Sequence, residues 1–286
     1  MTNKYSPYRL RRDLSRLFAY VFLSVFAVVF LFPFYWLFIS AFKAKDQIFV
    51  SPPQFFPSPW RFSNFHDVLN APNIDMIRSF VNSVVIAAGH CGLALFLCSL
   101  AGYAFAKYPN APGRDKLFAF VLGTMMIPFA VLIIPLYVIM MKLHAVNTYW
   151  AMIIPGAANA FGIFWMRQYV SSNVHDDLLD AARIDGCSEF GIYWRVAVPI
   201  IKPAMAALGI LTLIFAWNNL MLAFLFMRTK DMYTLPLVIY LLNGETRIPY
   251  GMVMAGSLLA TLPLVLAFLL FQRYFIEGIT AGAIKG

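Results

Sequence analysis

The sequence carries little charge. Asp, Glu, Lys and Arg make up 12% of its 286 residues, whereas a soluble domain carries roughly 25%. Hydrophobic residues make up 61%, including 28 Phe, 14 Tyr and 6 Trp, which is more apolar surface than a protein exposed to water tolerates. This composition excludes a soluble enzyme, a disordered tail and a secreted disulfide scaffold, and it predicts an integral membrane protein.

Several site signatures are also missing. The chain has 3 cysteines, and their positions fit neither a metal-ligand spacing nor a disulfide framework. The net charge is +9, yet no basic run with interleaved aromatic residues suggests nucleic-acid binding. No Gly-x-x-x-x-Gly-Lys-[Ser/Thr] phosphate loop occurs. Any energy source for this chain must therefore be a second polypeptide or an ion gradient.

Long uncharged runs dominate the rest of the sequence. A membrane-spanning helix needs roughly 20 apolar residues, and this length predicts an all-α membrane protein with six transmembrane helices. The predicted spans are residues 17–40, 82–106, 117–141, 149–166, 203–227 and 251–272. The first run is longer than that of a signal peptide and no cleavage site follows it, so we expect it to be retained. No acid lies in these spans, although gradient-driven carriers usually place acids there; His90 is their titratable candidate.

Basic residues predict the orientation of the spans. With both termini in the cytoplasm, the cytoplasmic segments hold 14 Lys and Arg against 8 outside, as the positive-inside rule requires. The predicted organisation is a cytoplasmic N-terminal segment (1–16), a permease domain (17–275) and a cytoplasmic C-terminal tail (276–286). The outer loops at 41–79 and 228–250 are the longest, and the first is rich in proline.

The cytoplasmic loop at 173–199 has the signals of a short helix. Asn173 can cap its start, Asp176 and Asp177 favour the positive end of the helix dipole, and Gly186 suits a left-handed stop. A second short helix is predicted from Ser188 to the residue before Pro199. The spacing places one set of residues on a common side of the first helix: Leu178, Ala181, Ala182 and Asp185.

Two interpretations of this loop are open. It can be an amphipathic helix that touches lipid headgroups or packs on its own bundle. However, Asp176 to Glu189 holds five acids and one Arg, and an anionic membrane surface attracts basic segments instead. The charge therefore favours a docking helix for a basic partner, with Asp180 and Asp185 as acceptors.

The residues of this loop resemble a known motif. The run Asp180-Ala-Ala-Arg-Ile-Asp-Gly186, followed by Phe190 and Pro199, is similar to the coupling motif of ATP-binding-cassette (ABC) importer permeases. Other similar segments are Phe80-Val-Asn-Ser83, Trp217-Asn-Asn219, Thr234-Leu-Pro236 and the ending Gly278 to Gly286. The chain most resembles the second permease subunit of maltose-type oligosaccharide importers, and within them the arabino-oligosaccharide permeases. Position 180 departs from the family, which usually has Glu there, so the ionic contact has a shorter reach.

The resemblance implies a type I ABC importer permease fold in a bacterial cytoplasmic (inner) membrane. It implies four kinds of partner: a second homologous permease, two copies of a cytoplasmic ABC ATPase, an external solute-binding protein and membrane lipid. ATP and Mg would bind the ATPase subunits, with no cofactor in this chain. The ATPase-coupling residues implied by the motif are Asp180, Ala181, Ala182, Asp185, Gly186, Glu189 and Phe190. The C-terminal tail would also reach toward the ATPase pair.

Polar residues in and between the spans are candidate solute contacts. Trp217, Asn218 and Asn219 can line a substrate path, although bonding between helices of the bundle is the interpretation that membrane proteins favour. In the family, the last outer loop contacts the binding protein. That role would fall here on Gly244, Glu245, Thr246 and Arg247, and a solvated connector is an equal alternative.

These observations predict the permease subunit of an ATP-driven oligosaccharide importer, which is not itself an enzyme. The alternative is an ion-coupled secondary carrier or channel-like protein acting alone. A membrane enzyme is less favoured because no nucleophile–base pair or ligand cluster lies at span depth. Three substrate classes stay open: neutral oligosaccharides, uronic-acid oligosaccharides and glycerol phosphate.

Overall fold

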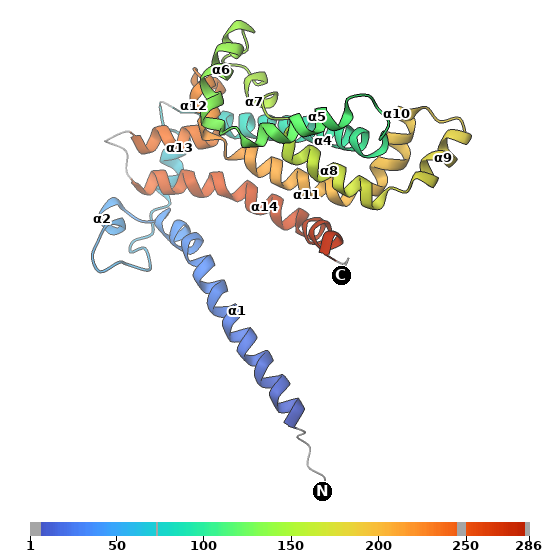
Figure 1. Cartoon of the computed structure of the whole chain (residues 1–286). Helices are drawn as coiled ribbons and strands as arrows, with labels where there is room; N and C mark the ends of the chain where they lie inside the picture. The colour runs from blue at the N-terminus through green and yellow to red at the C-terminus, as the bar shows by residue number, and fades with distance from the viewer. Residues whose placement is uncertain (1–6, 73, 245–249, 284–286) are drawn as a thin grey trace. The chain divides into compact units, whose positions relative to one another are not determined.

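The structure is a computed structural model that describes residues 7–72, 74–244 and 250–283. Within these ranges it contains helices and connecting segments but no β-strand (Figure 1). In chain order the elements are α1 (Pro7–Ser40), α2 (Lys45–Ile48), α3 (Ser63–Leu69), α4 (Met76–Lys107), α5 (Arg114–Gly123), η1 (Thr124–Met126), α6 (Phe129–Lys142), α7 (Trp150–Ile153), α8 (Ala160–Asn173), α9 (Asp176–Ile184), α10 (Glu189–Ile192), η2 (Tyr193–Ala197), α11 (Val198–Trp217), α12 (Leu220–Phe226), η3 (Lys230–Met232), α13 (Leu235–Gly244) and α14 (Tyr250–Ala283).

Four helical stretches among the described residues are long and apolar enough to cross a membrane: Arg11–Ser40, Met76–Lys107, Glu189–Trp217 and Tyr250–Leu270. A bent pair of helices raises the number to five if it counts as one span. The all-helical membrane architecture and the first, second and sixth predicted spans are therefore confirmed as helices. The other three predicted spans are bent or interrupted.

The third predicted span is bent sharply. Arg114–Met126 and Phe129–Lys142 meet at 105°, and the bend falls at Pro128, which precedes the first residue of α6. Proline has no backbone N–H to donate and disfavours helical geometry in the residue before it. The local sequence thus accounts for the place of the bend.

The fourth predicted span, 149–166, is wrong as one continuous helix. The four-residue α7 ends at Ile153, and α8 begins at Ala160 and runs on to Asn173. Between them lie Pro155 and Gly156, and Gly156 has φ 77°, a left-handed conformation that favours glycine. Its apolar composition suggested a span, but the Pro-Gly pair breaks the helix.

The fifth predicted span also differs at both ends. The helix runs from α10 through the π-helical segment η2 into α11, so the predicted stop before Pro199 is wrong. Pro199 lies in the first turn of α11, directly after the π-helical segment. Proline is tolerated in a first turn and where a π-bulge rearranges the hydrogen bonds. At the other end, α11 stops at Trp217, and Asn218 and Asn219 separate it from α12.

The chain falls into two compact units. One joins the part up to Leu69 with Leu242–Leu259, and the other joins Asn70–Leu241 with Ala260–Gly286. In the first unit, the most apolar part of α1 has no buried residue. Its end is fastened to the proline-rich loop by the buried Lys43, whose Nζ donates to the Gln54 carbonyl at 2.5 Å and lies 4.1 Å from the Trp36 ring.

In the second unit, α4, α8 and α11 pack against one another, and Figure 1 shows them running side by side. Small residues allow a close approach between α4 and α8. A Cβ at Gly102 would lie 2.6 Å from the Met166 Cβ and 2.7 Å from the Arg167 nitrogen, so glycine is required at this contact. The buried core that these helices share includes Cys98, Met166, Val170, Ile201 and Leu208. This packed core supports both parts of the candidate site.

Candidate functional site

The first part of the candidate site is α9, which begins at Asp176 and ends at Ile184. Asp176 and Asp177 lie in its first turn, and Gly186 follows it with φ 78°, so the predicted acidic start and left-handed stop are confirmed. The predicted cap is wrong. Asn173 is the last residue of α8, where its amide donates to the Tyr169 carbonyl at 2.9 Å, and His175 precedes α9 without a side-chain cap.

One face of α9 is buried in the second unit. Leu179 and Ala182 lie in the core with Ile192 and Tyr193, so the predicted common side is wrong for Ala182. The helical period puts Leu179 and Ala182 three residues apart on the inner face, a pairing that the Ala-Ala motif had obscured. The outer side presents exposed residues: Leu178, Ala181, Ile184 and Asp185.

Exposed apolar side chains accompany this outer side. Ile184 is 87% exposed at the end of α9, and Phe190 and Trp194 are more than half exposed in the helical segment that follows. Ile184 lies outside the long apolar helices, where a large exposed apolar residue marks an interaction surface more often than a solvated one. We refer to the exposed residues Leu178, Ala181, Ile184, Asp185 and Phe190 as the α9 surface.

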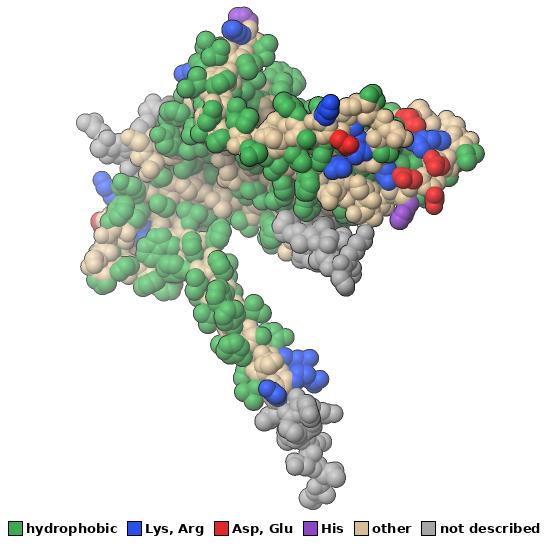
Figure 2. Space-filling view, viewed as in Figure 1, with side chains coloured by type: hydrophobic (Ala, Val, Ile, Leu, Met, Phe, Trp, Pro, Cys, Tyr) green, Lys and Arg blue, Asp and Glu red, His purple; other side chains and the backbone are tan. Residues whose placement is uncertain are grey.

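Charged side chains gather at the same end of the second unit, as Figure 2 shows. The Arg183 guanidinium bonds Asp180 at 2.6 Å and Glu189 at 2.9 Å. The Tyr108 hydroxyl donates to Glu189 at 2.5 Å. Burial is the main cause that raises the pKa of Tyr108, and this hydrogen bond raises it further. Two of the predicted coupling acids, Asp180 and Glu189, are thus engaged within the chain, whereas Asp185 makes no ion pair with any described residue.

A second ion pair fixes the start of α9. Lys107, at the end of α4, donates to the Val174 carbonyl at 2.5 Å and to the Asp176 carboxylate at 2.7 Å. The lysine side chain is 7% exposed, while that of Asp176 is 77% exposed. The hydrogen bond and the charge of Lys107 lower the pKa of Asp176. Lys107 therefore ties α9 to the end of a long apolar helix.

The second part of the candidate site is the break after α11. Asn218 donates from Nδ2 to the Ile214 carbonyl at 3.0 Å, and Asn219 caps α12 by accepting from the Leu222 nitrogen at 3.1 Å. Both line a cavity of about 780 Å³ with Tyr240. Trp217 does not line it: this side chain is buried, and its Nε1 donates to the Ala260 carbonyl at 3.2 Å. Both interpretations of the Trp-Asn-Asn segment thus hold in part, because its amides bond the chain and also border a cavity.

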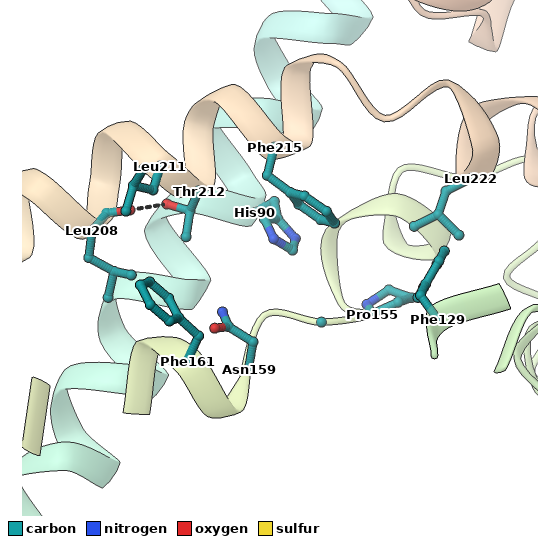
Figure 3. A pocket seen from close by; sticks show the side chains of 11 residues that line it. His90, Phe129, Pro155, Asn159, Phe161, Leu208, Leu211, Thr212, Phe215 and Leu222 are labelled. Carbon is teal, nitrogen blue, oxygen red and sulfur yellow. Dashed lines mark hydrogen bonds between the residues drawn. The ribbon is translucent and has the colours of Figure 1, made fainter. Parts of the chain in front are cut away.

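A smaller cavity of about 370 Å³ was not predicted from the sequence. It shares Phe129 and Phe215 with the larger one. Its lining comes from α4, α6, α8, α11 and α12 and from the interrupted segment after α7: His90, Phe129, Pro155, Gly156, Asn159, Phe161, Leu208, Leu211, Thr212, Phe215 and Leu222 (Figure 3). The Pro155-Gly156 pair was the available signal, because a helix break at span depth is tolerated where it lines a cavity.

The segment before α13 is fixed by the start of α4. The buried Asn82 amide donates to the carbonyls of Asp231 and Tyr233 at 2.8 and 2.9 Å and accepts from the Tyr149 hydroxyl at 2.8 Å. Of the predicted binding-protein contacts, Gly244 is the last residue of α13. Glu245, Thr246 and Arg247 lie outside the described residues.

Residues 98–280 match the family of binding-protein-dependent transport system inner membrane components, which is well over half of the chain. The chain belongs to this family. The match includes α9, the break after α11 and most of the residues that line both cavities.

Individual relatives are similar to this chain over nearly its whole length. The chain is 34% identical over 285 residues to the arabinooligosaccharides transport system permease protein AraQ of Bacillus subtilis, covering 99% of this chain and 98% of that protein. It is 34% identical over 275 residues to the lactose transport system permease protein LacG of Rhizobium radiobacter, covering 96% and 98%. Among solved structures, a chain of a bacterial ABC transporter for import of the acidic polysaccharide alginate superposes with a TM-score of 0.77 at 26% identity, covering 96% of this chain and 100% of that one. The resemblance predicted from the motifs is confirmed.

Proposed function

We propose that this chain is the permease subunit of an ABC importer that translocates an oligosaccharide delivered by an external solute-binding protein. Membership of the family of binding-protein-dependent transport components carries this proposal. The saccharide is proposed because the relatives named above are permeases of saccharide transport systems. ATP and Mg would be used by separate ATPase subunits, because the sequence has no phosphate loop.

The coupling element of the proposal is α9 with the residues around it. Exposed Asp185 and the apolar side chains of the α9 surface offer one charge and a hydrophobic patch to a cytoplasmic ATPase. Interfaces of this kind combine buried apolar anchors with charged groups that select the partner. Ala181 allows close approach, Ala182 and Gly186 shape the helix, and Asp180 and Glu189 hold Arg183 in place. One ATPase copy would dock here and a second on the homologous sister permease.

The proposed arrangement in the membrane has six spans, with both termini and α9 in the cytoplasm. The bent pair α5–α6 would form the third span, and the interrupted α7–α8 region would form the fourth. The 1–16 segment and the 276–286 tail would be cytoplasmic, and α14 extends as a helix to Ala283, within that tail. The distribution of basic residues supports this orientation.

The proposed solute path includes the cavity at Asn218 and Asn219. Its lining combines two amides, the Tyr240 side chain and aromatic rings, and pockets for small molecules commonly combine apolar walls with a few polar groups. The last outer loop, with Gly244, Glu245, Thr246 and Arg247, would contact the binding protein on the external side of the membrane, opposite to α9.

The test is charge reversal at Asp185 in the complete transporter, reconstituted with its sister permease, ATPases and binding protein. We expect Asp185→Lys to lower binding-protein-stimulated ATP hydrolysis and uptake by about tenfold or more, because a charged contact at an interface is replaced by repulsion. Gly186→Arg should act similarly, since its φ of 78° strains any side chain. Asp177→Lys is the matched control, because it reverses an exposed acid in the first turn of the same helix. Unchanged uptake in Asp185→Lys and Gly186→Arg would rule out α9 as the coupling element.

A further inference from the structure

The smaller cavity has a buried histidine on its wall. His90 is 2% exposed, and its Nδ1 lies 3.0 Å from the Ile153 carbonyl oxygen. A carbonyl can only accept a hydrogen bond, so Nδ1 carries a proton. Burial disfavours the charged form of the ring, and in the neutral ring Nε2 is an acceptor. Nε2 has no partner among the residues that the structure describes. Figure 3 shows the His90 ring pointing into the cavity.

The rest of the lining offers apolar rings and a few neutral polar atoms. Phe129, Phe161 and Phe215 contribute aromatic side chains. The Thr212 hydroxyl donates to the Leu208 carbonyl at 2.9 Å, which leaves its oxygen able to accept. The Asn159 side-chain oxygen accepts from the Gly162 nitrogen at 2.7 Å. A ligand here would therefore need hydroxyl hydrogens to donate to His90 and Thr212, and C–H faces to lie against the rings.

Charge is missing from the lining of both cavities. No Asp, Glu, Lys or Arg is among the described residues that border either one. Moving an anion from water into such surroundings costs desolvation free energy, and no opposite charge in the lining offsets that cost. Neutral His90 presents a lone pair, which repels a carboxylate or a phosphate and attracts a hydroxyl. The lining therefore favours neutral oligosaccharides over the two anionic substrate classes that the sequence leaves open, uronic-acid oligosaccharides and glycerol phosphate.

We propose that the smaller cavity is a subsite for one neutral sugar unit, in which His90 Nε2 accepts a hydrogen bond from a sugar hydroxyl. The proposal rests on the proposed function and narrows it to neutral oligosaccharides, against oligouronates and glycerol phosphate. The volume of about 370 Å³ lies within the roughly 300–1,000 Å³ of small-ligand pockets. The two cavities adjoin at Phe129 and Phe215, so neighbouring sugar units of one chain would lie in both.

The experiment measures saccharide binding to the complete transporter in lipid nanodiscs by saturation-transfer NMR, without the binding protein, which would otherwise select the ligand first. The probes are arabinotriose, maltotriose, a mannuronate trisaccharide and glycerol 3-phosphate. The variants are His90→Phe, which removes the acceptor, and His90→Gln, which keeps a neutral acceptor. His175→Phe is the matched control, because it makes the same replacement at an exposed histidine that does not line the cavity.

We expect at least one neutral trisaccharide to bind the wild type and His175→Phe with the same affinity. It should bind His90→Phe about tenfold more weakly and His90→Gln with an intermediate affinity. Loss of one hydrogen bond to a buried group accounts for a change of that order. The mannuronate trisaccharide and glycerol 3-phosphate should bind the wild type at least about tenfold more weakly than that neutral trisaccharide does. Equal binding of either anion, or wild-type binding by His90→Phe, overturns the subsite. If His90→Phe fails to assemble, the wild-type comparison of neutral and anionic probes decides alone.

The proposed function has a separate readout. Uptake by the complete transporter with its binding protein tests whether any saccharide is carried. Absence of uptake for every saccharide contradicts the importer itself. Saccharide uptake without an effect of His90 on binding contradicts only the subsite and assigns the cavity to lipid or packing.

Discussion

The two ends of the second unit use opposite chemistry. Around α9, charged side chains pair with one another, as in the link from Arg183 to Asp180 and Glu189. Around the two cavities, the described lining is uncharged and its polar atoms are those of histidine, threonine, asparagine and tyrosine side chains. The difference shows that ion pairs gather where another protein is proposed to dock, whereas the cavity lining proposed to meet solute relies on neutral groups.

The largest effect is expected from placing a charge at the uncharged end. Thr212 is buried in α11 and lines the smaller cavity. Thr212→Asp puts a carboxylate at span depth without a cation, at a cost of about 2.5–3.5 kcal/mol. We expect little folded protein in the membrane fraction, measured by quantitative immunoblotting and size-exclusion chromatography. Thr212→Val is the neutral control, and accumulation of Thr212→Asp at its level would break the comparison.

A smaller effect is expected from removing the buried cation at the charged end. Lys107→Met leaves the Val174 carbonyl without its donor, which costs about 1–3 kcal/mol, and the exposed Asp176 pair adds less. We expect a lower midpoint of thermal unfolding and faster tryptic cleavage near α9. Lys116→Met, an exposed lysine in α5, is the control. A midpoint equal to that control would show that the link does not hold α9.

The same link gives a dependence on pH. Lys107 lowers the pKa of Asp176 in the folded state, so the pair stabilises the fold above the ordinary carboxylate pKa. This contribution is lost as the pH falls through the lowered value. As the pH falls from the ordinary carboxylate pKa through the lowered pKa of Asp176, the free energy of unfolding of the wild type should therefore decrease more than that of Lys107→Met.

The smallest effect is expected from Arg183→Gln. Both of its ion pairs are exposed, and exposed pairs contribute little and are screened by salt. We expect a drop in the unfolding midpoint that is smaller than that of Lys107→Met at low ionic strength and vanishes at about 1 M salt. A drop as large as that of Lys107→Met would mean that the exposed network, rather than the buried cation, fixes α9.

Much of the helical architecture follows from the sequence, because a long uncharged run at 17–40 or 251–272 has no stable arrangement in a membrane except a helix. The interruptions were harder to predict. Hydropathy over 149–166 averages across the Pro155-Gly156 break, and it also averages across the Asn218-Asn219 break in 203–227. Composition thus identified where the chain is apolar, but not where the backbone stops being helical.

The candidate site was predictable only where it is local in sequence. The acidic first turn of α9 and the left-handed Gly186 lie within one short segment, so local signals suffice. The inward position of Ala182 depends on packing against α10 and η2, which the spacing within α9 does not contain. The pair of Asp180 with Arg183, three residues apart on α9, was a local signal within the motif. The cavity around His90 is assembled from five helices and the segment after α7, and no local pattern brings those residues together.

The π-helical segment η2 has a mechanical consequence. Because it joins α10 to α11 without a loop, Glu189–Trp217 is one uninterrupted helical stretch, and at about 1.5 Å per residue it is about 43 Å long. One tip of this rod lies beside α9 and the other beside Asn218. Any tilt imposed at the first tip becomes a sideways displacement at the second, about 7 Å for ten degrees over that length. The backbone itself thus connects the ion pairs to the cavity without an intervening loop.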